Sequence, residues 1–220
     1  MRSSPVITDV RGDDPSEELL RPAVEALQRG AVVAFPTDTV YGLGALADNT
    51  AAVDRLYAMK GRAETKPLQV LLADTARGEA LGILPPAARL LAEAFWPGGL
   101  TIVVPRPPDL WAPPARGRPT IGLRVPACAA ARALIRLAGP LAATSANRSG
   151  QPSPRTAADV LAGLSAELDC LLDGGEAPLG RESTVVDVSG PQPVVLRAGA
   201  VSIEALARVL PGLRVAGGAD

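Results

Sequence analysis

The sequence contains no histidine, and this absence removes several kinds of active site. A Ser-His-Asp triad and a Cys-His dyad both need an imidazole, so neither is open to this chain. The two cysteines, Cys128 and Cys170, lie 42 residues apart with no CxxC pair, which excludes a zinc site of the usual kind. We expect both to be small buried hydrophobic residues in a reducing compartment.

Aromatic residues and an excess of positive charge are lacking as well. Aromatics make up 3% of the 220 residues, and 22 basic against 23 acidic side chains give a net charge of −1. This balance disfavours a globally basic nucleic-acid-binding surface, although it allows a local basic groove. No apolar run approaches the roughly 18 to 20 residues of a membrane span, and the N-terminal residues lack the apolar region of a signal peptide. We therefore expect a soluble, cytoplasmic protein with no membrane partner.

Lysine is the scarcest charged residue. The chain has only Lys60 and Lys66, within seven residues of each other, against 20 arginines. A lysine offers a compact point charge on a flexible stem, which suits a position deep beside a phosphate or carboxylate better than a guanidinium does. Chance placement is the alternative explanation, and the neighbouring segments have to decide between the two.

Strand and helix patterns alternate along most of the chain, which predicts an α/β fold. Helices are expected from the cap Asp14 to Gly30, after the caps at 48–50 to Lys60, and over 85–95, 129–137, 156–164 and 203–210. Strands are expected over 31–35, 67–72, 100–104, 120–125, 141–143, 185–188 and 194–196. The last two are typical of an antiparallel pair, so we predict a mixed sheet. Six prolines in 105–119 predict an irregular loop that leaves the core.

Two polar loops each follow a predicted strand. Pro36–Gly44 carries two threonines, an aspartate and a tyrosine, and Thr144–Pro154 is rich in hydroxyl and amide groups. Ligand sites of open α/β sheets lie where strands end, and such groups can surround a phosphate without a Walker loop. Ordinary Asx or ST turns are the alternative. Gly42–Ala47 also matches G-x-G-x-x-A, but that string alone is weak and sits badly between the strand and the next helix.

Arg124 lies inside a predicted strand, where a charged side chain is unusual. It indicates either a charged ligand that faces it or an edge strand that is open to solvent.

Together these segments resemble the YrdC-like family of threonylcarbamoyl-AMP synthases, over about residues 31–200. The matching blocks, in order, are PTDTVYGLG (36–44), KGR (60–62), KPL (66–68), FWPGGLT (95–101), IGLRVP (121–126), TSANRSGQPSP (144–154), LDGG (172–175), EST (182–184) and LRAG (196–199). The chain is similar to the short, single-domain (TsaC-type) members. We expect one domain over 1–220, with a motif-bearing core over about 15–212 and short flexible tails.

The resemblance implies a fold, a reaction and partners. The fold is a twisted, open, mixed sheet with flanking helices and a ligand groove on its concave face. The reaction converts threonine, bicarbonate or CO2, and ATP into threonylcarbamoyl-AMP and pyrophosphate, for threonylcarbamoyladenosine modification of tRNA. ATP is a substrate, Mg²⁺ is carried by its phosphates, and no protein metal site is expected. A functional link to the tRNA threonylcarbamoyl-transferase complex is implied, and weak RNA binding is allowed.

Matching motifs also assign residues. The ATP group is Lys60, Arg62, Ser145, Asn147, Ser153 and Arg197, with Lys60 and Arg62 also assigned as catalytic. The threonine group is Thr37, Lys66, Arg124 and Ser183, in which the guanidinium suits a carboxylate. Lys66 could assist on either anion. Two departures from the family leave the finer threonine contacts open: Leu71 stands where many relatives carry a histidine, and the loop before Thr120 lacks their Val-Thr-x-Gly pattern.

Two other functions stay open. A non-catalytic module of the same fold would bind double-stranded RNA or tRNA, with an affinity that falls steeply with salt. A carbamoyl-transfer enzyme would act on another acceptor amine. Release of pyrophosphate that depends on threonine separates both from the synthase.

Overall fold

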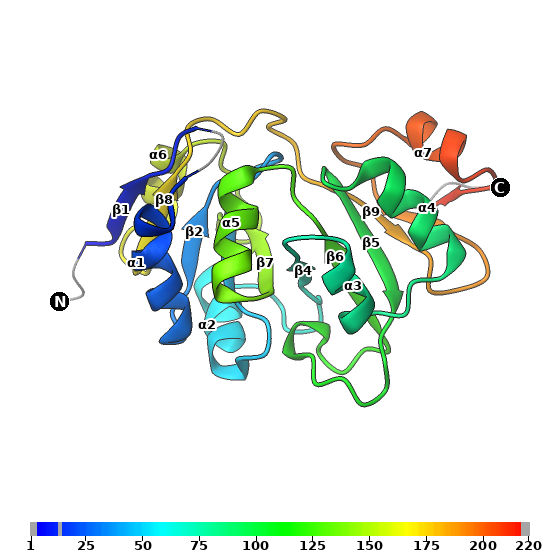
Figure 1. The fold of residues 1–220 in the computed structure, drawn as a ribbon, viewed down its shortest axis with the longest axis horizontal. Coiled ribbons are helices and arrows are strands. Elements are labelled where there is room, and N and C mark those ends of the chain that lie inside the picture. The colour runs from blue at the N-terminus through cyan, green and yellow to red at the C-terminus, as the bar shows by residue number, and fades with distance from the viewer. Residues whose placement is uncertain (1–3, 13–14, 217–220) are drawn as a thin grey trace.

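An open sheet of eleven strands runs through the residues that the computed structural model describes, 4–12 and 15–216 (Figure 1). The strands are β1 (Val6–Asp9), β2 (Val33–Phe35), β3 (Gly42–Leu46), β4 (Gln69–Leu71), β5 (Leu100–Pro105), β6 (Thr120–Arg124), β7 (Leu141–Ser145), β8 (Cys170–Asp173), β9 (Thr184–Asp187), β10 (Val194–Arg197) and β11 (Arg214–Val215). Their spatial order is β1-β8-β2-β3-β7-β4-β6-β5-β9-β10-β11. β4 is parallel to β6 and antiparallel to β7, so the predicted mixed α/β sheet is confirmed.

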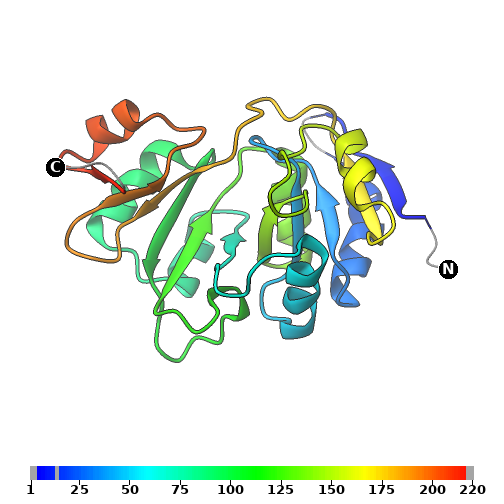
Figure 2. The same ribbon diagram turned by 180° about the vertical axis from the view of Figure 1, so that it is seen from behind.

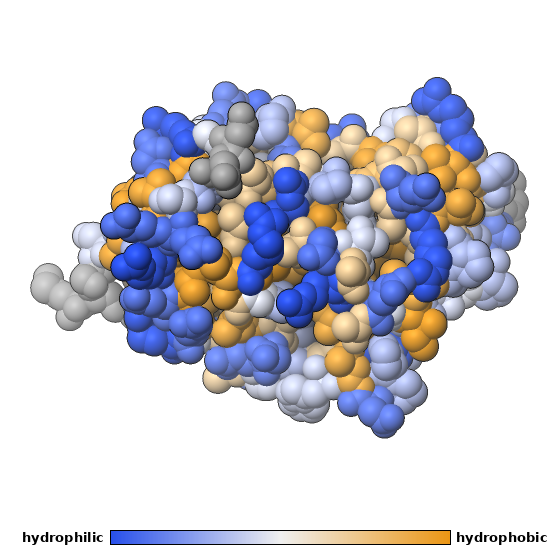
Figure 3. Space-filling model, viewed as in Figure 1, coloured by the Kyte–Doolittle hydropathy of each residue, from blue (hydrophilic) through white to orange (hydrophobic). Residues whose placement is uncertain are grey.

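Seven α-helices and one short 3₁₀ helix accompany the described strands. They are α1 (Glu17–Gln28), α2 (Thr50–Lys60), α3 (Ala76–Leu81), α4 (Pro86–Phe95), η1 (Pro113–Ala115), α5 (Ala129–Ala138), α6 (Ala157–Leu164) and α7 (Ile203–Val209). None of these described helices is long and apolar enough to cross a membrane. On the face shown in Figure 3, hydrophilic and hydrophobic residues are interspersed rather than gathered in one patch.

Three apolar clusters hold the helices against the sheet. α1 and α5 cover one side of the half around β2, and α2 and α6 cover the other side, seen from behind in Figure 2. α4 and α7 cover the half around β5. In each cluster buried helix residues meet buried strand residues: Leu27 and Phe35, Leu56 and Leu43, Leu91 and Ile102. Burying one such side chain contributes about 1.5–3 kcal/mol, so each helix is fixed by several contacts.

The alternation of side chains along β4 determines which of its residues point to each side of the sheet. Val70 packs in the cluster under α4, so Gln69 and Leu71 point to the opposite side of the sheet. Gln69 lies opposite Gly122 on β6 and Ala143 on β7, and directly opposed residues point to the same side. Gln69 is thus a polar side chain on a face where Leu71 and Ala143 pack in the cluster of α1 and α5.

The loop predicted over 36–44 is shorter than expected, because Gly42–Leu46 forms β3, antiparallel to β2. The two glycines make room for the ring of Phe35 on the neighbouring strand. A Cβ on Gly44 would lie 2.7 Å from a ring carbon of Phe35, and one on Gly42 3.0 Å away. The G-x-G-x-x-A match is thus a packing pattern within a strand, and the connecting loop is 36–41.

Other differences concern the two edges of the sheet and the first helix. β1, β8, β11 and α3 were not predicted, and β1 and β11 lie in segments expected to be tails. The predicted cap Asp14 falls outside the described residues, as do the outermost parts of both tails. Instead, Ser16 caps α1, with its Oγ accepting from Leu19 N–H. The proline-rich segment was predicted to leave the core, but part of it returns as η1, whose residues Pro113, Pro114 and Ala115 are buried. Pro114 O accepts from Leu68 N–H at 3.0 Å.

Candidate active site

Arg124 ends β6 and is 2% exposed. Its Nη2 donates to Asp38 Oδ1 at 2.7 Å, its Nη1 to Thr39 Oγ1 at 2.9 Å and its Nε to Gly98 O at 2.9 Å. Burial lowers the pKa of Arg124, and the negative charge of Asp38 opposes that shift. The sequence left two interpretations of Arg124: a charged ligand that faces it, or an edge strand open to solvent. β6 is not an edge strand, because it lies between β4 and β5, and the charge that faces Arg124 within the chain is Asp38.

Asp38 is part of the loop between β2 and β3. Its Oδ1 also accepts from Ala127 N–H at 3.0 Å, while its buried Oδ2 has no partner among the described residues. A guanidinium has five N–H donors, and the hydrogen bonds within the described chain use three of them. Two N–H groups of a firmly held Arg124 therefore remain for an anion.

Thr37 builds the turn that presents Asp38. Its Oγ1 donates to Val40 O at 2.6 Å and accepts from the backbone N–H of Thr39 at 3.1 Å. This is the hydroxyl-stabilised turn that the sequence allowed as the alternative. Thr37 and Arg124 nevertheless line the same small pocket, so the turn also forms part of a wall.

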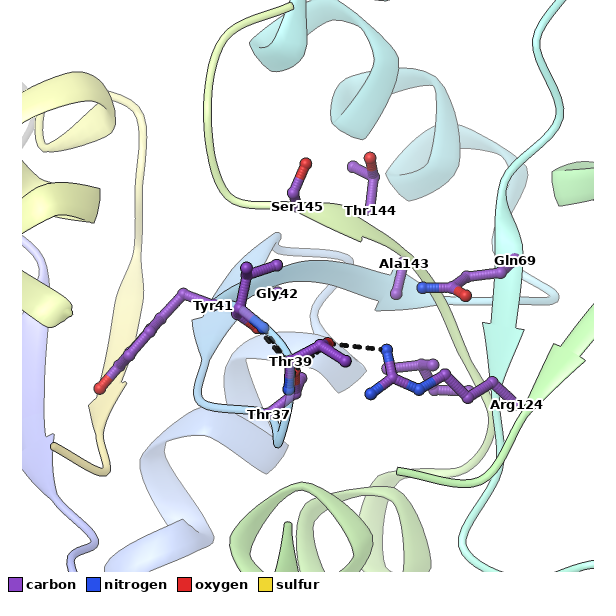
Figure 4. A pocket seen from close by; sticks show the side chains of 11 residues that line it. Thr37, Thr39, Tyr41, Gly42, Gln69, Arg124, Ala143, Thr144 and Ser145 are labelled. Atoms are coloured by element: carbon purple, nitrogen blue, oxygen red, sulfur yellow. Dashed lines mark hydrogen bonds between the residues drawn. The ribbon is translucent and has the colours of Figure 1, made fainter. Parts of the chain in front are cut away.

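The pocket lies between β3, β7, β4 and β6 (Figure 4). Its lining residues are Thr37, Thr39, Val40, Tyr41, Gly42, Gln69, Leu71, Arg124, Ala143, Thr144 and Ser145. Hydroxyl, amide and guanidinium groups from separate strands thus converge on one small space.

Lys60 is the last residue of α2 and is 4% exposed. Its Nζ lies 2.7 Å from Ser145 O, 3.1 Å from Ser145 Oγ, 3.0 Å from Asn147 O and 2.9 Å from Asn147 Oδ1. Burial and then the nearby Arg62 charge lower the pKa of Lys60 to about 8, with Glu182 opposing. A compact ammonium fits among four oxygens, whereas a planar guanidinium does not. Lys60 therefore ties α2 to the loop after β7.

Glu182 connects three further candidates. Its Oε1 accepts from Ser153 Oγ at 2.7 Å, and its Oε2 pairs with Arg197 Nη1. Arg197 also donates through Nη2 to Ser183 O at 3.0 Å and to Ser183 Oγ at 3.2 Å. Burial acts to raise the pKa of Glu182, but the Ser153 hydrogen bond and the charges of Arg197 and Lys60 together lower it. Glu182 is therefore a carboxylate among cations and hydroxyls.

Arg62 and Lys66 occupy the segment after α2. Arg62 donates to the carbonyl oxygens of Lys66 at 3.2 Å and Pro67 at 3.0 Å. Burial is the main cause that lowers the pKa of Arg62, and the charges of Arg197 and Glu182 also act on it, with opposite signs. The Lys66 side chain is exposed and makes no hydrogen bond or ion pair within the described part of the chain. Its assignment to threonine stays a prediction.

Comparisons with known proteins identify the family of the chain. The protein-family model for the Sua5, YciO and YrdC proteins, a family whose description is Telomere recombination, matches residues 25–199. The chain belongs to the Sua5/YciO/YrdC family. The family resemblance predicted from the sequence motifs is thereby confirmed.

Relatives within the Sua5/YciO/YrdC family show how far the similarity extends. The threonylcarbamoyl-AMP synthase of Bacillus subtilis is 41% identical over 213 residues, which are 96% of this chain and 61% of that protein. The structure of Pyrococcus abyssi Sua5 complexed with L-threonine has a TM-score of 0.91 at 40% identity, covering 96% of this chain and 62% of that one. Escherichia coli YciO has a TM-score of 0.82 at 25% identity, covering 92% and 99%. The chain thus spans about three fifths of the length of the curated relatives it matches first.

The structure joins most of the candidates in three groups. Lys60 contacts Ser145 and Asn147 directly. Ser153 and Arg197 bond to Glu182, and Arg197 also bonds to Ser183. Thr37 and Arg124 both contact Thr39. Arg62 and Lys66 belong to none of these groups: Arg62 donates to the carbonyl oxygens of Lys66 and Pro67, and the Lys66 side chain is exposed.

Sequence reasoning did not select Asp38, Glu182, Gln69 and Thr101, which the structure places in contact with one another or with the candidates. Asp38, Glu182 and Thr101 stood inside the matching motif blocks, so the signal for them was present. Gln69 had no comparable signal. Its position follows only from the register of β4 with β6 and β7.

Proposed function

We propose that this chain makes threonylcarbamoyl-AMP and pyrophosphate from threonine, bicarbonate or CO2, and ATP. The observation that carries the proposal is the presence of two anion-binding features in one site. One is the buried Arg124 with two spare N–H groups, and the other is the set of Lys60, Arg62 and Arg197 among hydroxyl groups. The relatives named as synthases support the same reaction.

Arg124 is assigned to the carboxylate of threonine. Because Asp38, Thr39 and Gly98 already hold its guanidinium, little reorganisation is needed when an anion binds. Thr37 and Ser183 are assigned to the polar groups of the same substrate, as the motifs suggest. Lys66 is assigned to the entrance of the site, where an exposed cation attracts both anionic substrates.

The triphosphate is assigned to the second feature. Lys60 fixes the backbone and side chains of Ser145 and Asn147, so their remaining N–H and O–H groups are presented in a set geometry. Arg62, Ser153 and Arg197 complete the set around the phosphates. Guanidinium groups suit phosphate oxygens because they can donate two parallel hydrogen bonds.

The chemistry requires positioning and charge neutralisation more than a strong base. Threonine adds its amine to CO2 to form a carbamate, with one proton released to solvent. A carbamate oxygen then forms a bond to the α-phosphorus of ATP while the bond to pyrophosphate breaks. An active site without histidine is sufficient for these steps.

Mg²⁺ is assigned to the phosphates rather than to the protein. No group of three or more Cys, Asp or Glu residues in the described chain is placed to hold a metal ion. Glu182, a carboxylate beside these cations, is already bonded to Ser153 and Arg197. A bound Mg²⁺ would neutralise phosphate charge, and it commonly keeps several waters.

The product is assigned to a threonylcarbamoyl transferase that acts on tRNA. The test of the proposal is pyrophosphate release, measured with all substrates and with threonine, bicarbonate or ATP omitted in turn. We expect release only in the complete mixture. Arg124→Lys and Ser145→Ala should lower it strongly, whereas Arg29→Ala, a change on the exposed end of α1, should not. Release that continues without threonine would refute the proposal.

A further inference from the structure

A chain of hydrogen bonds crosses the sheet from Arg197 on β10 to Gln69 on β4. Arg197 Nη2 lies 3.2 Å from Ser183 Oγ, which lies 2.9 Å from Thr101 Oγ1 on β5. Thr101 Oγ1 in turn donates to Gln69 Oε1 at 2.6 Å. Gly122 on the intervening strand β6 has no side chain, so Gln69 and Thr101 can meet above it.

These contacts fix the direction of every hydrogen bond. A guanidinium only donates, so Ser183 Oγ accepts from Arg197. Thr101 gives its single proton to Gln69, and therefore the proton between Ser183 and Thr101 belongs to Ser183. The chain ends at the amide oxygen of Gln69. The Gln69 amide is thus held in one orientation, although glutamine amides often rotate freely.

The other end of this amide faces the small pocket. Figure 4 shows the amide nitrogen of Gln69 directed across the pocket toward Ala143. No hydrogen bond from this nitrogen lies within the described part of the chain, and its two N–H groups are donors for a ligand. Two residues further along the same strand face, Leu71 presents an apolar surface to the same space.

The placement of Arg124, Leu71 and Gln69 around one small pocket favours a small ligand. Residues two apart on a strand lie roughly 7 Å from each other, and Leu71 is directly opposite Arg124 in the sheet. Gln69, Leu71 and Arg124 also line one small pocket, so a short side chain on a ligand whose carboxylate binds Arg124 lies beside Leu71 and Gln69. Because an amide N–H₂ group only donates, it cannot bond to the ammonium group of an amino acid, and a hydroxyl oxygen is a suitable acceptor for it.

We propose that Gln69 donates to the side-chain hydroxyl of the bound amino acid and that Leu71 packs against its methyl group. Gln69 is then the residue that distinguishes threonine from an isostere without the hydroxyl. Thr101 is a positioning residue, because it orients the Gln69 amide without touching the ligand. This inference rests on the proposed function for the assignment of Arg124 to the carboxylate.

The test compares L-threonine with L-2-aminobutyrate, which lacks only the hydroxyl. Both are measured by pyrophosphate release and, independently of turnover, by calorimetric binding. Gln69→Met keeps the length of the side chain and removes the donor. We expect it to lower kcat/KM and affinity for threonine about tenfold while changing those for 2-aminobutyrate less than threefold, as loss of one hydrogen bond to a neutral group predicts. Gln28→Met, the same change on the exposed end of α1, should leave the ratio unchanged.

Thr101 provides a second test. Thr101→Val should reduce the preference for threonine because the amide is no longer oriented, and Thr101→Ser, which keeps the hydroxyl, should restore it. A melting temperature for each variant separates these effects from unfolding.

The outcomes separate this inference from the proposed function. An unchanged preference in Gln69→Met overturns the assignment to the hydroxyl, and an equal loss for both ligands assigns the amide to a group that they share. If hydroxyl-dependent binding is lost in Gln69→Met but the wild-type chain releases no pyrophosphate, the inference stands and the reaction is wrong.

Discussion

Replacing Asp38 with alanine should destabilise the fold strongly. The side chains of Arg124 and Asp38 are 3% and 8% exposed, and Asp38 Oδ1 accepts from both Arg124 and Ala127. Removing the carboxylate leaves a buried guanidinium without a counter-charge, which costs about 3–5 kcal/mol. In a chain of this length each kcal/mol lowers Tm by about 2–4 °C, so Tm should fall by about 6–20 °C.

The assay is thermal unfolding with urea unfolding as a check. Glu176→Ala is the matched control, because it removes a carboxylate from an exposed ion pair. The side chains of Arg155 and Glu176 in this pair are 54% and 61% exposed. We expect the control to change stability by less than about 1 kcal/mol. Asp38→Asn should be intermediate, since the amide oxygen can still accept hydrogen bonds while the charge is lost.

A double variant tests the electrostatic cause. Asp38→Ala with Arg124→Met should be more stable than Asp38→Ala alone, because no unpaired charge remains in the interior. The reasoning is refuted if Asp38→Ala costs no more than Glu176→Ala, or if the double variant is no more stable than the single one.

Three further changes test other parts of the structure. Folding lowers the pKa of Lys60 from 10.5 to about 8, so between these pH values the unfolded chain binds more protons than the folded one. The stability of the wild type to urea, relative to that of Lys60→Met, should therefore rise through this pH range and stay flat below it. A difference in stability that stays flat up to pH 10.5 would contradict this. Glu182→Gln removes a negative charge from beside the proposed phosphates and should strengthen calorimetric ATP binding about fivefold at low salt, whereas weaker binding would mean that Glu182 mainly positions Arg197. Gly44→Val should cost about 1–3 kcal/mol in urea unfolding because its Cβ meets the Phe35 ring, and the additional change Phe35→Leu should recover part of that loss.

Local pattern was enough to predict much of the fold. Apolar periodicity and caps located α2, α4 and α6, where Asn49 and Thr156 cap as expected. β3 was missed because its glycines are typical of turns, and only the Phe35 ring on the neighbouring strand explains them. β1 was missed because it exists through parallel pairing with β8, more than 160 residues away, which no local pattern records.

The candidate site was predictable as segments but not as contacts. The motif blocks contained Lys60, Ser145 and Asn147. Ser145 and Asn147, which enclose the Lys60 ammonium, lie 85 and 87 residues from it in the sequence, so no local pattern predicts these contacts. Asp38 could not be chosen as the partner of Arg124 for the same reason. A charged residue inside a strand indicates that a counter-charge exists, but the chain topology determines where that charge comes from.

The opposite burial of the two lysines makes this chain suitable for selective labelling. Lys60 is enclosed by oxygen atoms, whereas Lys66, six residues on, is exposed at the same segment. Of the two lysines, an amine-reactive dye should therefore modify Lys66, because the Lys60 ammonium is enclosed. A fluorophore on Lys66 would report ligand binding beside the site without any cysteine having to be introduced.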